Sequence, residues 1–396
     1  MASRLRAKLN AMNAAAPKVE PESARLGGSI CPGGVAIYSD RRDADARLFS
    51  LDADGLRRIG WNGQALDIRR MLFLDTETTG LSGGAGTVAF LVGLGFIKDD
   101  TFVVEQYLMR DYADEPEMLG RIAERMRNFD AVCTFNGRNF DLPLLQARFT
   151  MCRMRDEWRE LPQLDLLYPA RRTWKLRIGS CRLSRIEEYI LGQGREGDLP
   201  GSEVPQRYFD FLKSGDMALL DDIIAHNRQD IATLGILLAH LCELYANPER
   251  ETRRPDLFSM GKALENQGEL RVSKELYRVA SIPAPVGSLK SIPENALAAE
   301  AAWRMYLLAR RSRDAETMRE ILERMANRRQ CRDRIYVELS KLYEHHYKNP
   351  HRALRYADLA ARYIPPEERE NLERRRARLC RKIEMKTKKE RDHGLL

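Results

Sequence analysis

Short apolar runs separated by tight turns dominate the chain after residue 70. The runs 71–74, 87–97 and 101–109 lack helical spacing, and a short segment with the turn Asp99-Asp100 separates the second from the third. Links this short cannot contain helical crossovers, so the pattern predicts three adjacent antiparallel strands.

Apolar positions three and four residues apart then alternate with brief apolar runs. The spacing predicts helices over 114–128, 141–150, 183–191, 205–214 and 217–245, with buried strands over 131–135 and 164–168. The order β-β-β-α-β-α-β-α indicates an α/β fold, a mixed sheet flanked by helices.

The first 68 residues are broken up by Gly and Pro and are expected to form an extension packed on the next domain. Runs at 35–38, 47–51 and 56–61 suggest a small set of β-hairpins. Residues 1–13 lack the apolar segment of a secretory signal. A short surface helix is the favoured interpretation there, and a transit peptide the alternative.

Beyond residue 248 strand signals disappear, and Ala, Leu, Glu, Arg and Tyr recur at helical spacing. A 34-residue helical-repeat pattern of the TPR type fits partly at two places, from Leu257 and from Leu339; a generic helical bundle is the alternative. The expected organisation is an extension over 1–68, an α/β domain over 69–247, a TPR-like helical domain over 248–373 and a basic tail over 374–396. The tail is expected to be a frayed helix or a disordered arm.

Composition changes this picture little, but charge is unevenly distributed. Of 396 residues, 43% are apolar and 31% charged, as in globular proteins, and no run is long enough to span a membrane. The net charge is +8, and the segment 374–391 alone has ten Lys or Arg and two Glu, a net +8. Residues 71–245 have 20 basic and 27 acidic side chains, a net −7. Within them, 148–185 forms a local basic stripe, either a phosphate-binding surface or a solvated helix face.

Seven cysteines, an odd number without a CxxC pair, argue against a disulfide framework or a zinc site. They favour a reducing compartment, so we expect a cytoplasmic location.

Two carboxylates stand where the first predicted strand ends. Asp75 and Glu77 follow the apolar run 71–74 and, as residues i and i+2 of a strand, share one face. Like charges at that distance call for a cation, and oxygen ligands favour Mg²⁺ or Mn²⁺. A strand that ends in a solvated acidic turn is the alternative.

Three later acids stand in comparable settings. Asp141 begins a predicted helix, Asp165 lies within an apolar run, and Asp230 follows His226 by one helical turn. Each could be structural by itself, for example as a helix N-cap. Together with Asp75 and Glu77 they place acids at strand ends and helix starts of one mixed α/β domain.

At these residues the sequence resembles a known family. Asp75-Thr76-Glu77-Thr78-Thr79-Gly80 is similar to the first motif of the DEDD exonucleases, which have a ribonuclease H-like fold. The segments 136–144 and 226–230 resemble their second and third motifs. With the loop 83–87 and the helical-repeat tail, the arrangement resembles the YprB-type ribonuclease H-like proteins.

The resemblance implies a nuclease that uses two divalent cations, Mg²⁺ or Mn²⁺, most often as a 3′→5′ exonuclease on a single-stranded end of DNA or RNA. The implied metal ligands are Asp75, Glu77, Asp141 and Asp230, with His226 as general base. The groups implied to contact nucleic acid are Thr78, Thr79, Gly80, Asn136 and Arg138. Asp165 is implied to lie behind the ligands or to cap a helix.

The sequence departs from the family at one position. One branch has a His five residues before the last Asp, where this chain has Ala225, and the other has a Tyr four residues before it, where this chain has His226. His226 is therefore either the general base or a structural histidine.

A different class of function is also compatible with the sequence. The α/β domain could bind nucleic acid without efficient catalysis while the helical domain recruits a protein partner. A dinucleotide-binding enzyme is disfavoured, because the loop 83–86 lacks G-x-G-x-x-G spacing and does not open a helix.

Overall fold

The computed structural model describes residues 28–30, 34–63, 65–80, 86–195, 200–283 and 291–393. The expected surface helix over 1–13, most of the loop 83–87 and the last three residues of the tail lie outside these ranges.

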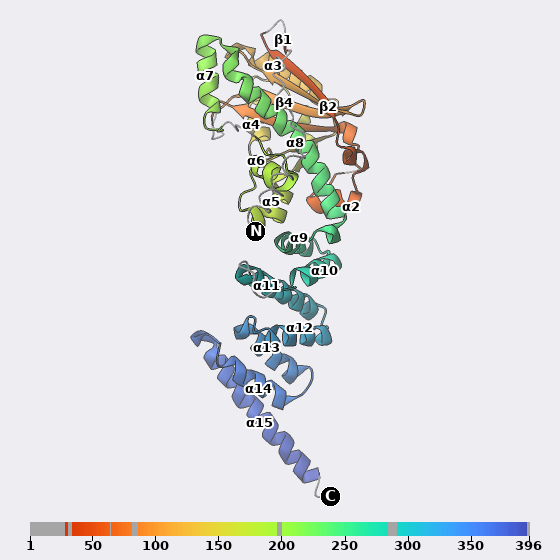
Figure 1. The fold of residues 1–396 in the computed structure, drawn as a ribbon, viewed down its shortest axis with the longest axis vertical. Helices are drawn as coiled ribbons and strands as arrows, with labels where there is room; N and C mark the ends of the chain where they lie inside the picture. The colour runs from red at the N-terminus through yellow and green to blue at the C-terminus, as the bar shows by residue number, and fades with distance from the viewer. Residues whose placement is uncertain are drawn as a thin grey trace, which may run out of the picture.

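A seven-stranded mixed sheet forms one end of the molecule (Figure 1). Its strands stand in the order β1-β2-β5-β4-β3-β6-β7. All neighbouring pairs from β1 to β3 are antiparallel, whereas β3–β6 and β6–β7 are parallel. The predicted antiparallel trio is confirmed. The strands are β1 (Gly28–Ile30), β2 (Ala36–Asp43), β3 (Met71–Thr78), β4 (Ala89–Lys98), β5 (Thr101–Leu108), β6 (Ala131–Thr134) and β7 (Gln163–Asp165).

Helices cover both faces of this sheet, as the α/β pattern predicts. Along β3, Leu72 and Leu74 join one apolar core, while Met71 and Phe73 join the other. One face is covered by α3 (Glu115–Met126), α4 (Asp141–Met151) and α7 (Val204–Ser214), and the other by α2 (Ala53–Ile59), α5 (Leu167–Ile178) and most of α8 (Asp221–Ala246).

Two glycines on β4 let α8 lie close to the sheet. A Cβ on Gly93 would be 2.3 Å from Oδ1 of Asn227, and one on Gly95 would be 2.4 Å from Cγ2 of Ile231. Side chains at either position would push the helix away, so these glycines set the depth at which α8 crosses. Because α8 lies this close to the sheet, its polar residues reach the acids of β3.

The prediction of N-terminal hairpins at 47–51 and 56–61 is wrong. Of the three runs, only the first lies in a strand, β2, which joins the main sheet beside β5. Residues 46–50 form a 3₁₀ turn and 53–59 form α2. The Asp52 carboxylate caps α2 by accepting from the Gly55 amide at 2.7 Å, and Gly60 ends the helix with φ +115°.

The last predicted strand is shorter than expected. β7 ends at Asp165, and α5 begins at Leu167, within the range 164–168 assigned to the strand. The Asp165 carboxylate accepts from the Leu167 amide at 3.0 Å and so satisfies a donor of the first turn. Residues 183–191 divide into α6 (Leu183–Ile186) and a π-helical turn, Glu187–Leu191.

Helices stack away from the sheet in the rest of the chain (Figure 1). Each packs on the next in chain order, and one apolar core runs from α8 into this stack without interruption. The helices are α9 (Arg254–Asn266), α10 (Leu270–Ala280), α11 (Ser291–Arg311), α12 (Ala315–Asn327), α13 (Arg332–His345), α14 (Pro350–Ala360) and α15 (Arg369–His393).

The described part of the basic tail, 374–393, belongs to α15 and is held by one buried acid. Glu344 on α13 accepts hydrogen bonds from Arg375 at 2.5 Å, Arg378 at 2.9 Å and Lys382 at 2.8 Å. Burial alone would raise the pKa of Glu344, but hydrogen bonds from Arg378 and Lys382 lower it to about 2. The first half of the tail is thus an anchored helix rather than a loose arm. Within the described ranges, no helix is long and apolar enough to cross a membrane.

Candidate active site

The acids of β3 lie where this strand loses its parallel neighbour. β6 pairs with β3 as far as Phe73, and then turns away at Thr134. Asp75 lies opposite Gly93 of β4, and Glu77 lies opposite Leu91. Both acids therefore stand at the carboxyl end of a parallel strand pair, an edge at which α/β proteins commonly place functional groups.

Asp141 reaches this edge from the first turn of α4. Its Oδ1 accepts from the Thr76 hydroxyl at 2.5 Å, so the residue between the two β3 acids holds the third. Burial raises the pKa of Asp141 to about 6, although the hydrogen bond from Thr76 opposes this.

Asp165 holds the loop that leads to Asp141. Its carboxylate accepts from the amides of Asn136 at 2.8 Å and Arg138 at 3.2 Å, in addition to Leu167. Asn136 has φ +69°, and the hydrogen bond stabilises that left-handed conformation. Asp165 thus supports the loop and caps α5.

Asn227 on α8 links Asp75 of β3 to Gln106 of β5, two strands of the same sheet. It is completely buried, and its Nδ2 donates to Oδ2 of Asp75 at 3.0 Å. Its Oδ1 accepts from Nε2 of Gln106 on β5 at 2.8 Å. The sequence interpretation did not include Asn227. A signal was present, because Asn227 interrupts the apolar i, i+4, i+8 series of Ile223 and Ile231.

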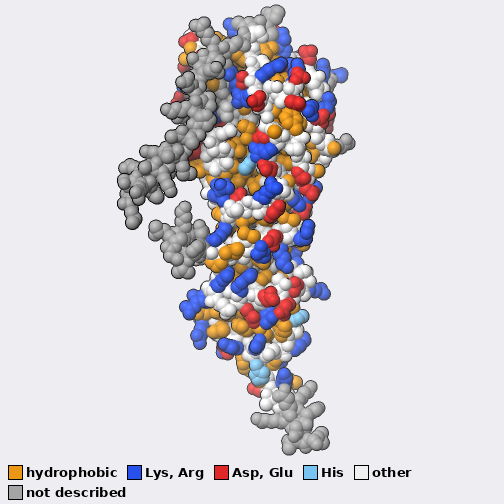
Figure 2. Space-filling view, turned by 45° about the vertical axis from the view of Figure 1, so that its right-hand side comes forward, with side chains coloured by type: hydrophobic (Ala, Val, Ile, Leu, Met, Phe, Trp, Pro, Cys, Tyr) orange, Lys and Arg blue, Asp and Glu red, His pale blue; other side chains and the backbone are white. Residues whose placement is uncertain are grey.

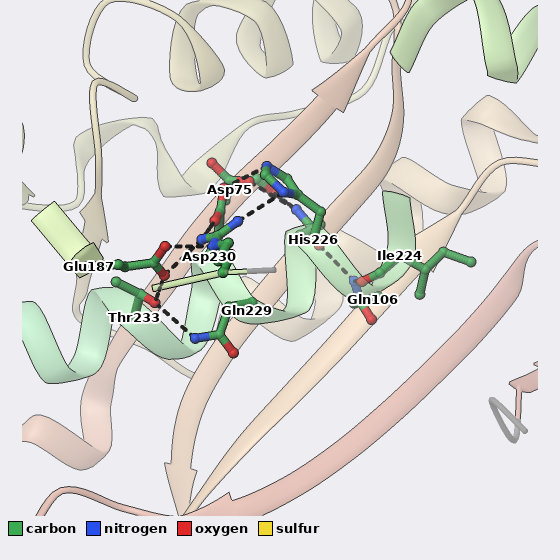
Figure 3. A network of polar contacts seen from close by, with 10 residues as sticks. Asp75, Gln106, Glu187, Ile224, His226, Gln229, Asp230 and Thr233 are labelled. Carbon is green, nitrogen blue, oxygen red and sulfur yellow. Dashed lines mark hydrogen bonds and ion pairs between the residues drawn. The ribbon is translucent and has the colours of Figure 1, made fainter. Parts of the chain in front are cut away.

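Asp230 follows on α8 and is held by two basic groups (Figure 3). Its Oδ1 contacts Nη2 of Arg195, and its Oδ2 lies 3.4 Å from Nε2 of His226. Arg195 also bonds Glu187 of the π-helical turn. Neither Arg195 nor Glu187 was predicted, because nothing in their sequence setting marks them as neighbours of Asp230.

His226 uses both ring nitrogens in this arrangement. Nη1 of Arg195 lies 2.8 Å from Nδ1. A guanidinium can only donate, so Nδ1 accepts and a neutral ring carries its proton on Nε2, toward Asp230. The ring is thereby oriented toward Arg195 and Asp230.

The four acids share one electrostatic environment. Burial raises the pKa of Asp75 well above its usual range, and Asp230, Asp141 and Glu77 raise it further. Burial also raises the pKa of Glu77 to about 8, with contributions from Asp230 and Asp141. The pKa of Asp230 is raised by burial, although His226 and Arg195 oppose this. The structure therefore brings Asp75, Glu77, Asp141 and Asp230 together as one group of mutually repelling carboxylates.

These carboxylates fit a hard divalent cation by their chemistry. All four offer oxygen ligands, and a cation would relieve the repulsion that raises their pKa values. In the part of the chain that is described, however, no group of three or more His, Cys, Asp or Glu side chains is arranged to hold an ion. The four carboxylates are suitable ligands for such a cation, and they have to move closer together to surround it.

A cavity of about 340 Å³ is lined by chain neighbours of these acids, but by none of the four acids themselves. Thr78 and Gly80 line it from β3, and Phe140 lines it from the loop before α4. Thr79, Asn136 and Arg138 are not among the residues that line it. The Thr79 hydroxyl instead accepts from the Val88 amide at 3.0 Å. The remaining lining residues are Thr87, Asn139, Pro143, Leu144, Ala147, Arg148 and Met151.

The basic stripe over 148–185 is partly internal. Arg148 bonds Glu115 at 2.6 and 2.5 Å, Arg172 donates to the Ile59 carbonyl at 2.8 Å, and Arg177 pairs with Asp256 at 2.7 Å. On the face in Figure 2, basic and acidic side chains alternate rather than form a uniform basic stripe.

The RNase H superfamily model matches residues 72–242, which include all four acids of the candidate site. These residues therefore form a domain of the RNase H superfamily. Over 320 residues it is 31% identical to the uncharacterized protein YprB of Bacillus subtilis strain 168, covering 79% of this chain and 75% of that protein. The chain is therefore a member of the same family as YprB.

Among solved structures, the chain is similar to a family B DNA polymerase from the archaeon Pyrobaculum calidifontis. The TM-score is 0.36 at 15% identity, over 63% of this chain and 30% of the polymerase. This similarity is too low to carry an inference about function.

Proposed function

We propose that the chain is a nuclease that depends on divalent cations and removes nucleotides from a 3′ end of DNA or RNA. The observation that supports this most is the group of four carboxylates, in which burial, together with Asp230 and Asp141, raises the pKa values of Asp75 and Glu77. Such repulsion is costly unless a cation offsets it. The 3′→5′ polarity rests on the resemblance of the three motifs to DEDD exonucleases.

Asp75, Glu77, Asp141 and Asp230 are the residues that would hold two cations, Mg²⁺ or Mn²⁺. When bound, such cations supply a water-derived nucleophile and stabilise charge on the phosphate. Thr76 fixes Asp141 and Asn227 fixes Asp75, so the fold itself orients two of the four ligands.

The cavity would receive the terminal nucleoside. Phe140 and Met151 are 44% and 57% exposed and line it, and they offer apolar surface on which a base can pack. Thr78 and Gly80, which follow Glu77 in the chain, line it as well. Arg148 also lines the cavity, but its pairing with Glu115 makes it a structural residue in this interpretation.

A digestion panel tests this function. End-labelled single- and double-stranded DNA and RNA are incubated with the full chain and Mn²⁺, and the product ladder reports activity, polarity and sugar preference. Asp75→Asn should reduce cleavage by more than the roughly 100-fold loss typical of residues that support metal ligands. Asp99→Asn, in the exposed β4–β5 turn, is the matched control. Cleavage that persists in Asp75→Asn would contradict the proposal.

A second candidate is a nucleic-acid-binding module without efficient catalysis. The engagement of Asp230 by Arg195 favours it, as does the lack of a ready ion-holding group among the described side chains. Under this candidate, α9–α14 would serve as a TPR-like scaffold for a protein partner, with a domain boundary near residue 248. Binding of labelled nucleic acid without any Mn²⁺-dependent cleavage would favour this function.

A further inference from the structure

Glu187, which is not one of the four acids, anchors Arg195 beside them. Its Nε bonds Oε2 of Glu187 at 2.5 Å, and its Nη2 bonds Oε1 at 2.8 Å. Two parallel bonds of this kind fix the plane of a guanidinium. Glu187 itself is completely buried and also accepts from the Thr233 hydroxyl. Arg195 therefore has little freedom to turn away from Glu187.

A second edge of the same guanidinium, formed by Nη1 and Nη2, contacts His226 and Asp230. Nη2 contacts Oδ1 of Asp230, and Nη1 lies 2.8 Å from Nδ1 of His226. His226 in turn lies 3.4 Å from Oδ2 of Asp230. Both carboxylate oxygens of Asp230 thus point at basic side chains of the chain itself.

The charge of Arg195 affects more than one acid of the candidate site. It lowers the pKa of Glu77 as well as that of Asp230, against the effect of burial on each. Only 13% of the Arg195 side chain is exposed, so solvent screens this charge poorly. Arg195 offsets part of the repulsion among the acids, which is the task that a divalent cation would otherwise perform.

We propose that Arg195 is an internal competitor of the divalent cation. It pairs with Asp230 and has to release it before Asp230 can ligate a metal, so Arg195 sets the metal concentration at which the site fills. This inference rests on the proposed metal site. It gives Arg195, which lies outside the three sequence motifs, a role in positioning Asp230.

A simpler role for Arg195 makes a different prediction. If Arg195 only neutralises the buried Glu187, its loss should lower stability and leave metal affinity unchanged. If Arg195 competes for Asp230, its loss should tighten metal binding, whatever the effect on stability.

A Mn²⁺ titration of the full chain, with free Mn²⁺ followed by its EPR signal, separates these roles without measuring cleavage. Arg195→Gln should lower the Kd for Mn²⁺ by about tenfold, the effect of losing one charged contact of ordinary strength. Arg195→Lys keeps the positive charge but lacks the planar guanidinium, so its Kd for Mn²⁺ should lie between those of Arg195→Gln and wild type. Arg185→Gln is the matched control, since Arg185 is exposed and pairs with Glu188 on the same segment.

Because Arg195→Gln leaves Glu187 buried without its cation, the double variant Glu187→Gln/Arg195→Gln is titrated as well, with circular dichroism as the test of folding. It should bind Mn²⁺ as tightly as the single variant. Unchanged or weaker affinity in both variants, while Asp75→Asn abolishes binding, would overturn the inference and leave the proposed function intact. No Mn²⁺ binding by any variant or by wild type would overturn both.

Discussion

Asn227 joins Asp75 of β3 to Gln106 of β5 through one side chain. Its amide nitrogen donates to Asp75 at 3.0 Å, and its amide oxygen accepts from Gln106 at 2.8 Å. Gln106 also donates to the Ile224 carbonyl at 2.8 Å, which fixes the start of α8 on the sheet. The orientation of an acid of the candidate site and the position of a helix therefore depend on one pair of joined, buried amides, Asn227 and Gln106.

Asn227→Ala should lower the free energy of unfolding by about 1–3 kcal/mol, because it removes both hydrogen bonds from a buried position. It should also weaken Mn²⁺ binding, since the bond from Asn227 is what lowers the pKa of Asp75 against burial. Urea unfolding and Mn²⁺ titration measure the two effects. Asn371→Ala, at an exposed position on α15, should change neither. Wild-type stability in Asn227→Ala would show that the amide is dispensable.

The raised pKa values of the acids predict that stability falls as pH rises. Glu77 has a pKa of about 8 in the fold against the ordinary 4.5, and Asp141 about 6 against 3.8. Between the ordinary and the raised values the folded chain binds more protons than the unfolded chain, so the free energy of unfolding decreases with pH. The decrease attributable to these two acids should run from about pH 4 to pH 8.

Mn²⁺ should reverse this trend, because a bound cation replaces the protons that offset the repulsion. The expected result is a rise in Tm on adding Mn²⁺ that is larger at pH 8 than at pH 5. Melting curves at both pH values, with Mn²⁺ and with EDTA, measure it. The trend should be weaker in Asp75→Asn. A metal-induced shift that is equal at both pH values would be evidence against a cation among these acids.

The ion pair between α5 and α9 should make the attachment of the helical stack sensitive to pH. Asp256 is completely buried and bonds Arg177 at 2.7 and 3.0 Å. Burial raises the pKa of Asp256 to about 6, although Arg177 opposes this. Arg177→Ala leaves the acid unpaired and should cost about 3 kcal/mol at pH 8.

At pH 5 the same variant should lose less stability, because an unpaired Asp256 takes up a proton and avoids a buried charge. Chemical unfolding at the two pH values measures the difference. Arg171→Ala, at an exposed position on the same helix, is the control and should show no such dependence. An equal cost at both pH values would mean that Asp256 stays charged without its partner.

Glu344→Gln should loosen α15. The variant loses charged hydrogen bonds to Arg375, Arg378 and Lys382, each worth roughly 1.5–3 kcal/mol to a charged acceptor. Trypsin should then cleave the basic tail faster, which gel electrophoresis follows. Glu373→Gln, which removes an exposed pair with Arg376, should not accelerate cleavage. In wild type this anchor should persist above about pH 4.5 and weaken as pH falls toward the pKa of about 2.

The parts of the fold that follow from local patterns were predictable. Apolar runs with two-residue turns define β4 and β5, and apolar spacing defines α3, α4 and α8. The N-terminal predictions were wrong because the sequence of α2 shows little apolar periodicity. Its helical conformation depends on its two caps, Asp52 and Gly60. α5 was missed because Asp165 stops the strand and starts the helix within one apolar run.

In the candidate site, the acids were predictable and their partners were not. Asp75, Glu77 and Asp141 stand at ends of predicted elements, where a carboxylate is conspicuous, and Asp230 follows His226 by one turn of a predicted helix. Asn227 is visible only as a polar residue on an apolar stripe. Arg195 reaches Asp230 from a segment 35 residues earlier in the chain. That contact depends on how the π-helical turn presents Glu187, which no local spacing encodes.

α8 carries Asp230 in its first half, and its far end adjoins the helical stack. It is one unbroken helix of 26 residues, about 39 Å long at 1.5 Å per residue. Its first half holds Asn227 and Asp230 against the sheet, and near its far end Tyr245 is buried against Thr173. The close contacts at Gly93 and Gly95 meet the helix at Asn227 and Ile231, one on each side of Asp230. A tilt of the far end of α8 about these contacts would therefore move Asp230 little, so the sheet insulates this acid from motion of the helical stack.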